Sequence, residues 1–271
     1  MYIANKVSSY IGGATQLGIT LQNTLMNHTK TVSSISTQLN VSSLLHQRTD
    51  IPFILGETNS LYNQGRPGLS NTFGAALWGV DFNLWCASQG IERVHMHMGT
   101  NFRYQSWQPV DTNNTSKGTK APYYGNIAVA SALGDLTKGN VQVVNLPLPQ
   151  YNEAAYATYV NSTLARLSVI NMASYNYSGD ANTSARPTKE YDFSLPQTCK
   201  GTGVVQRLMA NGSDAITGIT FNGLSYNYEL DGGRPVSLGN VTKDEVVSIG
   251  SDGLMKVELP YSSAAIVQLR C

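Results

Sequence analysis

The sequence predicts an α/β unit over residues 1–135 and an antiparallel β domain over residues 136–271. In the first part, stretches with helical periodicity alternate with short apolar runs, which is the pattern of parallel strands joined by helical crossovers. From about residue 138, short segments rich in Val, Ile, Thr and Tyr are separated by glycine-containing turns, which indicates antiparallel hairpins. The 271 residues are 41% hydrophobic, enough to bury a core in each part.

Apolar spacing defines the elements of the first part. Leucines and other apolar residues recur at three, four and seven positions where helices are predicted, and continuous apolar runs mark strands that are buried on both faces. This order fits either a doubly wound sheet or a (β/α)8 barrel. The predicted elements are a helix over 17–40, a strand over 51–56, a helix between the cap Ser70 and the stop Gly90, a strand over 91–98 and a helix over 123–133.

The second part reads as an antiparallel β-sandwich. Its predicted strands are short and end at Asn-Gly, Asp-Gly-Gly or Ser-Asp-Gly turns, without a phosphate-binding loop or a nucleotide-binding motif. The predicted strands cover residues 141–146, 164–173, 203–209, 215–221, 245–249, 254–259 and 264–269.

Composition limits the partners of this chain. Charged residues make up 13% and the formal net charge is +1, so neither nucleic acid nor an anionic membrane surface is expected as a partner. This chain shows no signal peptide. The many Asn-x-Ser/Thr sequons nevertheless favour a secreted, extracellular glycoprotein over a cytosolic protein. The sequons begin at Asn27, Asn40, Asn113, Asn114, Asn161, Asn176, Asn182, Asn211 and Asn240.

Three cysteines allow one disulfide. We predict a bond between Cys199 and Cys271, which would tie the later half of the chain to its terminus. Cys86 lies in an apolar helical stretch and is predicted to be either a buried thiol or the partner of a group that this chain does not contain.

The stretch from Phe53 to Trp78, which contains Gly-Glu-Thr-Asn-Ser-Leu-Tyr, resembles the nucleophile strand and following loop of glycoside hydrolase family 79, the β-glucuronidase and heparanase family. The resemblance continues through residues 91–107 and covers essentially the whole chain. It implies that residues 1–135 are part of a (β/α)8 TIM barrel with strands 7 and 8, and that residues 136–271 are the β-sandwich domain after it. It further implies a retaining hydrolase acting on terminal glucuronic acid by double displacement, without a metal or other cofactor.

Glu57 is the predicted nucleophile. It follows an apolar strand, and the carboxyl ends of barrel strands carry active sites. A retaining glycosidase needs such a carboxylate to attack the anomeric carbon while a second carboxyl about 5 Å away protonates the leaving group. Without the motif, a lone Glu after a strand is more often a cap or a salt-bridge partner.

The resemblance also places substrate contacts in the two loops that follow these strands. Phenol hydroxyls donate hydrogen bonds to a carboxylate without carrying a full charge, and loop amides do the same. His97 is interpreted as pocket wall or as a hydrogen-bonding residue of the barrel core rather than as a metal ligand, because no third ligand is placed nearby. The predicted substrate-binding residues are Tyr62, Tyr104, Asn59, Ser60, Gln64, Gly65 and His97.

The acid/base of the family, an Asn-Glu pair that precedes the nucleophile, has no counterpart before Glu57 in this chain. Asn152 and Glu153 have the right identities but follow the nucleophile. The chain therefore resembles a fragment, and we expect it to be inactive alone. Two other readings are a non-catalytic β-sandwich fragment with a carbohydrate-binding or structural role, and an endo-acting relative, for which denser basic clusters would be expected. The sequence does not indicate the oligomeric state or the natural aglycone.

Overall fold

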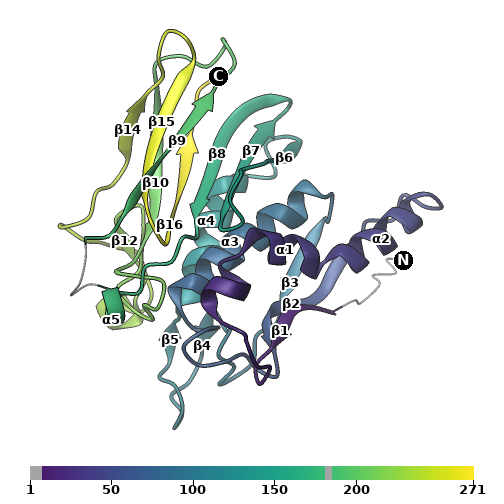
Figure 1. Ribbon diagram of the computed structural model, residues 1–271, viewed down its shortest axis with the longest axis vertical. Coiled ribbons are helices and arrows are strands. Elements are labelled where there is room, and N and C mark those ends of the chain that lie inside the picture. The colour runs from purple at the N-terminus through teal and green to yellow at the C-terminus, as the bar shows by residue number, and fades with distance from the viewer. Residues whose placement is uncertain (1–7, 181–184) are drawn as a thin grey trace.

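The computed structural model describes residues 8–180 and 185–271 of the chain. A small parallel sheet with its helices forms one end of the molecule, and a β-sandwich extends from it to the other end, where the C-terminus lies (Figure 1). None of the helices in these described residues is both long and apolar enough to cross a membrane.

The parallel sheet has three strands in the order β1-β2-β3, namely β1 (Ser8–Gly13), β2 (Ile54–Tyr62) and β3 (Arg93–Met96). Strand β3 lies within the strand predicted over 91–98, whereas β2 begins inside the strand predicted over 51–56 and continues beyond it. Strand β1 was not predicted, because Ser-Ser-Tyr-Ile-Gly-Gly lacks a continuous apolar run and carries two glycines, which are depleted in strands. It forms because β2 offers its backbone as a parallel partner.

The single helix predicted over 17–40 is wrong. The segment divides into a π-helical turn η1 (Leu21–Leu25), α1 (His28–Ser34) and α2 (Ser36–His46). Asn27 has an extended backbone and its side chain accepts a hydrogen bond from the amide of Lys30 at 3.0 Å, so it starts a new helix instead of continuing the previous one. Helical spacing alone does not reveal such an internal cap.

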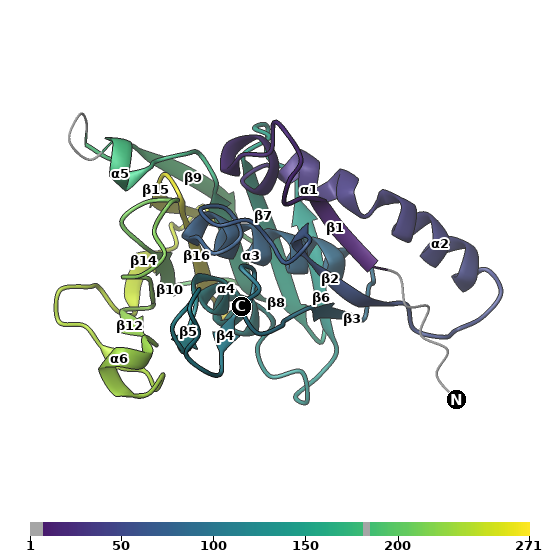
Figure 2. The same cartoon turned by 90° about the horizontal axis from the view of Figure 1, so that it is seen from below.

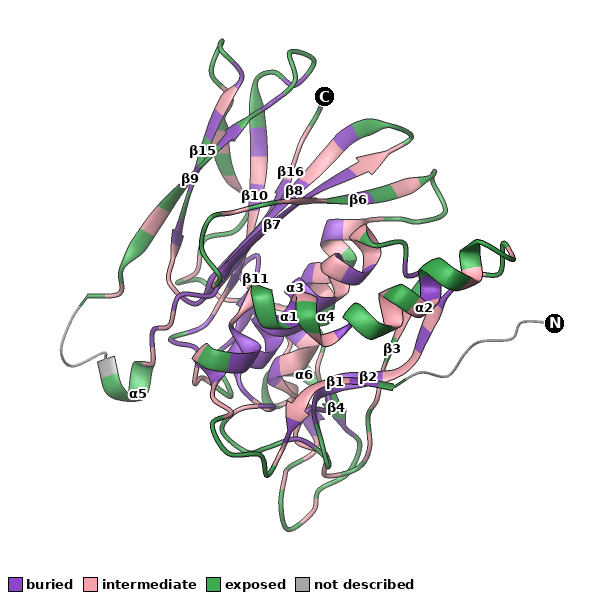
Figure 3. Cartoon of the chain, turned by 45° about the vertical axis from the view of Figure 1, so that its right-hand side comes forward, coloured by how far each residue is buried: buried purple, intermediate pink, exposed green. Residues whose placement is uncertain are grey.

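Helix α3 (Phe73–Ser88) is buried on nearly all sides, with Trp78 only 1% exposed (Figure 3). The predicted cap Ser70 is wrong, since Thr72 occupies the N-cap position, whereas Gly90 ends the turn after α3 with a φ of 76°. Helix α4 (Ala121–Leu133) crosses α3 at Gly125, where an added Cβ would lie 2.6 Å from the Ala76 carbonyl oxygen. The missing side chain therefore lets the two helices approach closely.

The β-sandwich consists of a large antiparallel sheet in the order β13-β12-β11-β10-β16-β8-β7-β6, with β14 beside β10, and a two-stranded sheet of β9 and β15. Its strands are β6 (Val141–Leu146), β7 (Glu153–Val160), β8 (Thr163–Asn171), β9 (Thr188–Ser194), β10 (Thr202–Met209), β11 (Thr220–Phe221), β12 (Leu224–Ser225), β13 (Val236–Ser237), β14 (Glu245–Ser248), β15 (Leu254–Pro260) and β16 (Ser263–Gln268). The remaining elements are the hairpin β4 (Trp107–Gln108) and β5 (Gly118–Thr119), and the short helices α5 (Tyr177–Asp180) and α6 (Tyr228–Asp231).

The large sheet is covered on both faces. Along β7, Tyr156 packs into the core shared with α3 and α4, whereas its neighbours Ala155 and Ala157 pack against β9 and β15. The same alternation holds along β16 for Ile266 and Val267. In Figure 2 the helices lie against one side of this sheet. Because helices and sheet share one core, the two parts of the chain meet across a packed interface and not through a linker alone.

Sequence patterns found most of these strands but not β7, β9 or the two-residue strands β12 and β13. The segment predicted over 215–221 is a strand only at Thr220 and Phe221. Helix α4 ends at Leu133 and β6 begins at Val141, on either side of the predicted domain division after residue 135.

A buried polar cluster joins α1, α3 and β7. The Asp81 side chain is fully buried, its Oδ1 lies 2.9 Å from His28 Nδ1, and the Tyr156 hydroxyl donates to the same oxygen at 2.6 Å. Burial alone would lower the pKa of His28, but the hydrogen bond and the negative charge of Asp81 outweigh it and raise that pKa. Charged His28 is thus stabilised inside the fold.

We expect this cluster to make stability depend on pH. A histidine whose pKa is higher in the folded state contributes stability that is complete below its unfolded pKa of about 6.5 and disappears as the pH rises through the folded value. Urea unfolding at pH 5.5 and pH 8.5 should show a stability difference between the unaltered chain and His28→Gln that shrinks at the higher pH. A difference that stays constant or grows would contradict the assignment.

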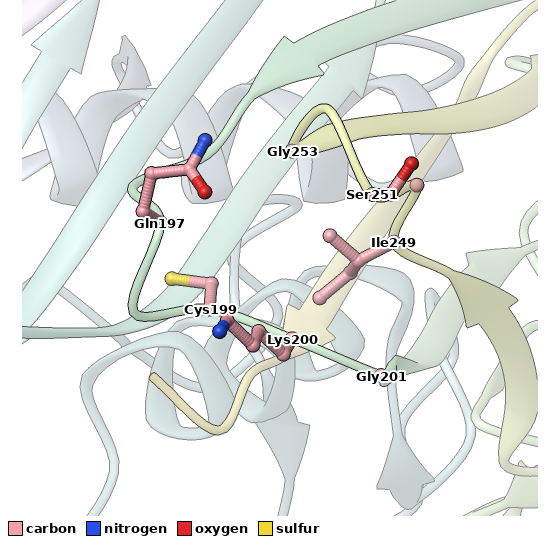
Figure 4. A pocket seen from close by; sticks show the side chains of 8 residues that line it. Gln197, Cys199, Lys200, Gly201, Ile249, Ser251 and Gly253 are labelled. Atoms are coloured by element: carbon pink, nitrogen blue, oxygen red, sulfur yellow. The ribbon is translucent and has the colours of Figure 1, made fainter.

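Cys199 and Cys271 form a disulfide across a sequence separation of 72 residues, and Cys86 is a free, buried thiol. Beside the disulfide lies a hollow of about 410 Å³, lined by Gln197, Lys200 and Ile249 among others (Figure 4). The C-terminal residue Cys271 lies at the sandwich end of the molecule, away from the parallel sheet (Figure 1).

The disulfide should stabilise the β-sandwich by restricting the unfolded chain. Cys271→Ser is expected to lower the free energy of unfolding by about 2–4 kcal/mol, as measured by urea denaturation. Reductant should lower the stability of the unaltered chain to the same level and leave the variant unchanged. Equal stability of both proteins without reductant would contradict this expectation.

Candidate active site

Glu57 lies inside β2, the central strand of the parallel sheet, and not after its end as the sequence predicted. Strand β2 continues for five more residues to Tyr62. Its register with β3 shifts between Leu55 and Thr58, so Glu57 lies in an irregularity of the ladder. Such bulges redirect a side chain relative to a regular strand, and here the redirected side chain is the carboxylate.

Two side chains lie beside this carboxylate, and a third contacts one of them. The Tyr10 hydroxyl donates to Glu57 Oε1 at 2.8 Å, and His97 Nδ1 lies 3.7 Å from the same oxygen. His97 Nδ1 is also 3.2 Å from the Tyr10 hydroxyl and 3.0 Å from the Tyr104 hydroxyl. The hydrogen bond from Tyr10 holds the carboxylate, and the Glu57 side chain keeps 32% of its surface exposed, so a ligand can still reach it.

The phenols of this cluster remain protonated near neutral pH. Desolvation and the hydrogen bond to Glu57 raise the pKa of Tyr10 far above its usual value. Desolvation, together with the charge of Glu57, raises the pKa of Tyr104 as well, against a hydrogen bond with Tyr10 that lowers it. Both hydroxyls are therefore neutral donors, which is what a carboxylate beside them requires.

The two predicted tyrosines lie in different surroundings. Tyr104 is 2% exposed and holds His97, so its contact with Glu57 is indirect. Tyr62 is 47% exposed, and its ring stands edge-on to Tyr10 at 6.4 Å. At Gly13 an added Cβ would lie 2.6 Å from the Tyr62 ring, so this glycine makes room for it. Of the two, Tyr62 presents the more accessible hydroxyl to a ligand.

Asn59 and Ser60 are buried and bonded inside the protein. The Asn59 amide donates to the His97 carbonyl at 2.9 Å, and Ser60 donates to the Ser70 hydroxyl at 3.0 Å. Their burial and these partners favour a role in positioning His97 and the loop after β2 over direct contact with a substrate.

Gln64 and Gly65 form the turn after β2, with φ values of 67° and 76°. The Gly65 amide donates to the Leu61 carbonyl at 3.1 Å, so its predicted role as a carboxylate donor is wrong in this conformation. The Gln64 carbonyl accepts from the Arg103 amide at 2.6 Å and thereby joins the loops after β2 and β3.

Tyr10 is the residue that sequence reasoning missed. It lies on β1, forty-seven positions before the carboxylate it binds, in a segment without an apolar run. In the described part of the chain, no three His, Cys, Asp or Glu side chains gather where they would hold a metal ion. Glu153, which follows the nucleophile in sequence and was not predicted to be the acid/base, lies at the start of β7. It is 4% exposed and forms an ion pair with Lys189.

The sequence of this chain is similar to those of known glycosidases. Residues 155–266 match the model of the glycosyl hydrolase family 79 C-terminal beta domain. A β-glucuronidase of Aspergillus niger is 60% identical over 277 residues, which cover 98% of this chain and 50% of that protein. Residues 155–266 therefore belong to the C-terminal beta domain of glycosyl hydrolase family 79, and nearly the whole chain is similar to one half of a β-glucuronidase. This confirms the resemblance drawn from the motif around Glu57.

Two further proteins are similar to this chain. A β-glucuronidase of Neurospora crassa is 50% identical, over 96% of this chain and 53% of that protein. A 4-O-α-L-rhamnosyl-β-D-glucuronidase from Fusarium oxysporum has a similar fold, with a TM-score of 0.78 at 24% identity over 96% of this chain and 52% of that one. This chain thus spans about half the length of the curated relatives that it matches.

Proposed function

We propose that this chain provides the nucleophile half of a retaining β-glucuronidase, with Glu57 as the attacking carboxylate. The observation that carries the proposal is the partly exposed Glu57 oxygen, held by the Tyr10 hydroxyl at 2.8 Å beside His97. In the first step Glu57 would attack the anomeric carbon and expel the aglycone, and in the second step water would release glucuronic acid from the covalent intermediate. The β-glucuronidase relatives support this substrate class.

The parallel sheet fits a segment of a (β/α)8 barrel, and we propose strands β2 and β3 as its seventh and eighth strands. Tyr62 and His97 would line the glucuronyl pocket, with Tyr104, Asn59 and Ser60 positioning them and the Gln64 turn at its edge. The carboxyl that protonates the leaving group would come from outside this chain. General acid catalysis contributes roughly 10²–10⁴-fold, so the chain alone should fail on glycosides with poor leaving groups.

A comparison of leaving groups tests both statements. A 2,4-dinitrophenyl β-D-glucuronide needs no protonation, so the chain should release dinitrophenolate in a burst and retain one glucuronyl unit on the peptide that contains Glu57, as seen by mass spectrometry. A methyl β-D-glucuronide should not react. If the activated substrate gives no burst and no adduct, the assignment of Glu57 as nucleophile is wrong and a non-catalytic module is favoured. Rapid turnover of the methyl glycoside would contradict the proposal that the acid/base lies outside this chain.

We also propose that the protein is secreted and glycosylated. The sequon asparagines Asn40, Asn161, Asn211 and Asn240 are exposed in the structure, whereas Asn182 lies outside the described residues. The chain produced in a secreting eukaryotic host should become smaller on treatment with an endoglycosidase that removes N-linked glycans. Unchanged mobility would overturn this proposal.

A further inference from the structure

A second pocket, of about 450 Å³, lies between the loop that follows β3 and two segments of the β domain. Phe102 and Arg103 come from the loop after β3, Ile216 from the segment before β11, Glu229 from the short helix α6, and Lys120 stands before helix α4. The Phe102 ring lies edge-on to His97 at 5.5 Å, so this residue belongs both to the pocket and to the surroundings of the Glu57 cluster. Two parts of the chain that are far apart in sequence therefore build the pocket beside the candidate active site.

The two cations of this pocket, Arg103 and Lys120, have no direct ion-pair partner within the described residues 8–180 and 185–271. Arg103 donates to the Asn101 carbonyl at 2.9 Å, and the Lys120 ammonium donates to the Ser116 carbonyl at 2.5 Å. Desolvation lowers the pKa of Lys120, against the negative charges of Glu229 and Asp111, which raise it. Lys120 also occupies the N-cap of the 13-residue helix α4, where the helix dipole disfavours a cation, so a bound anion would be stabilised twice.

Two acceptors in the pocket wall have no partner among the described residues. Gln105 is 3% exposed and its Oε1 accepts no hydrogen bond, and the same is true of the buried Thr119 hydroxyl oxygen. A buried polar atom without a partner costs free energy, so each of these atoms is satisfied when a ligand hydroxyl reaches it. The pocket thus combines sites for an anion with sites for hydroxyl groups.

We propose that this pocket binds an acidic sugar unit, separate from the glucuronyl group that Glu57 would attack. Its carboxylate would face Arg103 and Lys120, its hydroxyls would donate to Gln105 and Glu229, and its apolar face would lie against Phe102. A compact anion such as phosphate fits less well, because it brings too few hydroxyl donors for the acceptors Gln105 and Glu229. The inference does not depend on Glu57 being a nucleophile.

Amide chemical shifts measure binding at each site separately. The chain is produced in an oxidising bacterial compartment so that the sequon at Asn114, on the pocket wall, stays unmodified. Titration with D-glucuronate should shift and saturate the amides of residues 115–120 and 227–229. Shifts confined to residues 57–62 would overturn the proposal and leave the Glu57 assignment intact.

Variants and ligand analogues define the chemistry. Arg103→Met and Lys120→Met should each weaken glucuronate binding at residues 115–120 by about tenfold, whereas the exposed control Arg48→Met should not. Glucose and acetate should bind at least about tenfold more weakly than glucuronate. Glucose 6-sulfate tests whether the pocket distinguishes a sulfate from a carboxylate. An affinity equal to that of glucuronate would assign the pocket to sugar acids in general. Equal affinity for acetate or for glucose, or unchanged binding by both pocket variants with native thermal midpoints, would refute an acidic sugar site.

Discussion

Glu57→Ala is expected to slow transfer of the glucuronyl group from the activated glucuronide by at least about 10³-fold, and added azide should restore reaction with formation of α-glucuronyl azide. The reason is geometric. The nucleophile of a retaining β-glycosidase attacks from the face opposite the leaving group, and the shortened side chain leaves room there for a small anion. The product stereochemistry, read by NMR, identifies which carboxylate was removed.

The exposed Glu92, which directly precedes β3, offers a matched control. Glu92→Ala should behave like the unaltered chain with and without azide. Formation of β-glucuronyl azide by Glu57→Ala would mean that Glu57 acts as acid/base and that the nucleophile lies elsewhere. An unchanged rate without azide would remove Glu57 from the chemistry altogether.

Asp81→Ala is expected to lower the free energy of unfolding by about 3–5 kcal/mol, because it leaves the partly buried cation of His28 and the buried Tyr156 hydroxyl without their shared partner. The loss is large because Asp81 joins α3 both to α1 and to the β7 strand of the large sheet. Urea denaturation near pH 6, where His28 is charged, measures it.

Tyr156→Phe provides the smaller, matched change. It removes one hydrogen bond and keeps the aromatic ring and the His28 pair, so it should cost about 1–2 kcal/mol. A loss for Asp81→Ala below that of Tyr156→Phe would show that the His28 pair contributes nothing to the junction of the two parts.

Local sequence patterns were sufficient to predict a strand where only one of its faces is buried or where its apolar residues form a continuous run. The apolar residues before Glu57 mark β2, and the Val-rich segment at 203–209 marks β10, because each pattern reflects one environment. Strand β7 was missed for the opposite reason. Its Ala155, Tyr156 and Ala157 are all buried because both faces of the large sheet are covered, and its alanines favour helix over strand in isolation.

The helix prediction over 17–40 failed for a different physical reason. Apolar spacing reports which face is buried and says nothing about the side-chain cap at Asn27 that begins α1. Likewise, Glu57 appeared to follow its strand because the apolar run stops there, whereas the ladder continues through polar residues that β1 and β3 bury.

By itself, the sequence determined the alternation of helices and strands, the change to antiparallel β structure and a carboxylate in a family 79 motif, because these are recorded in residues close together along the chain. Only the tertiary structure decided that Tyr10 holds Glu57, that Asn59 is buried behind His97, and that Arg103 and Lys120 share a pocket with the β domain. Such contacts join residues tens of positions apart. Their partners are chosen by strand register and packing, which no local pattern contains.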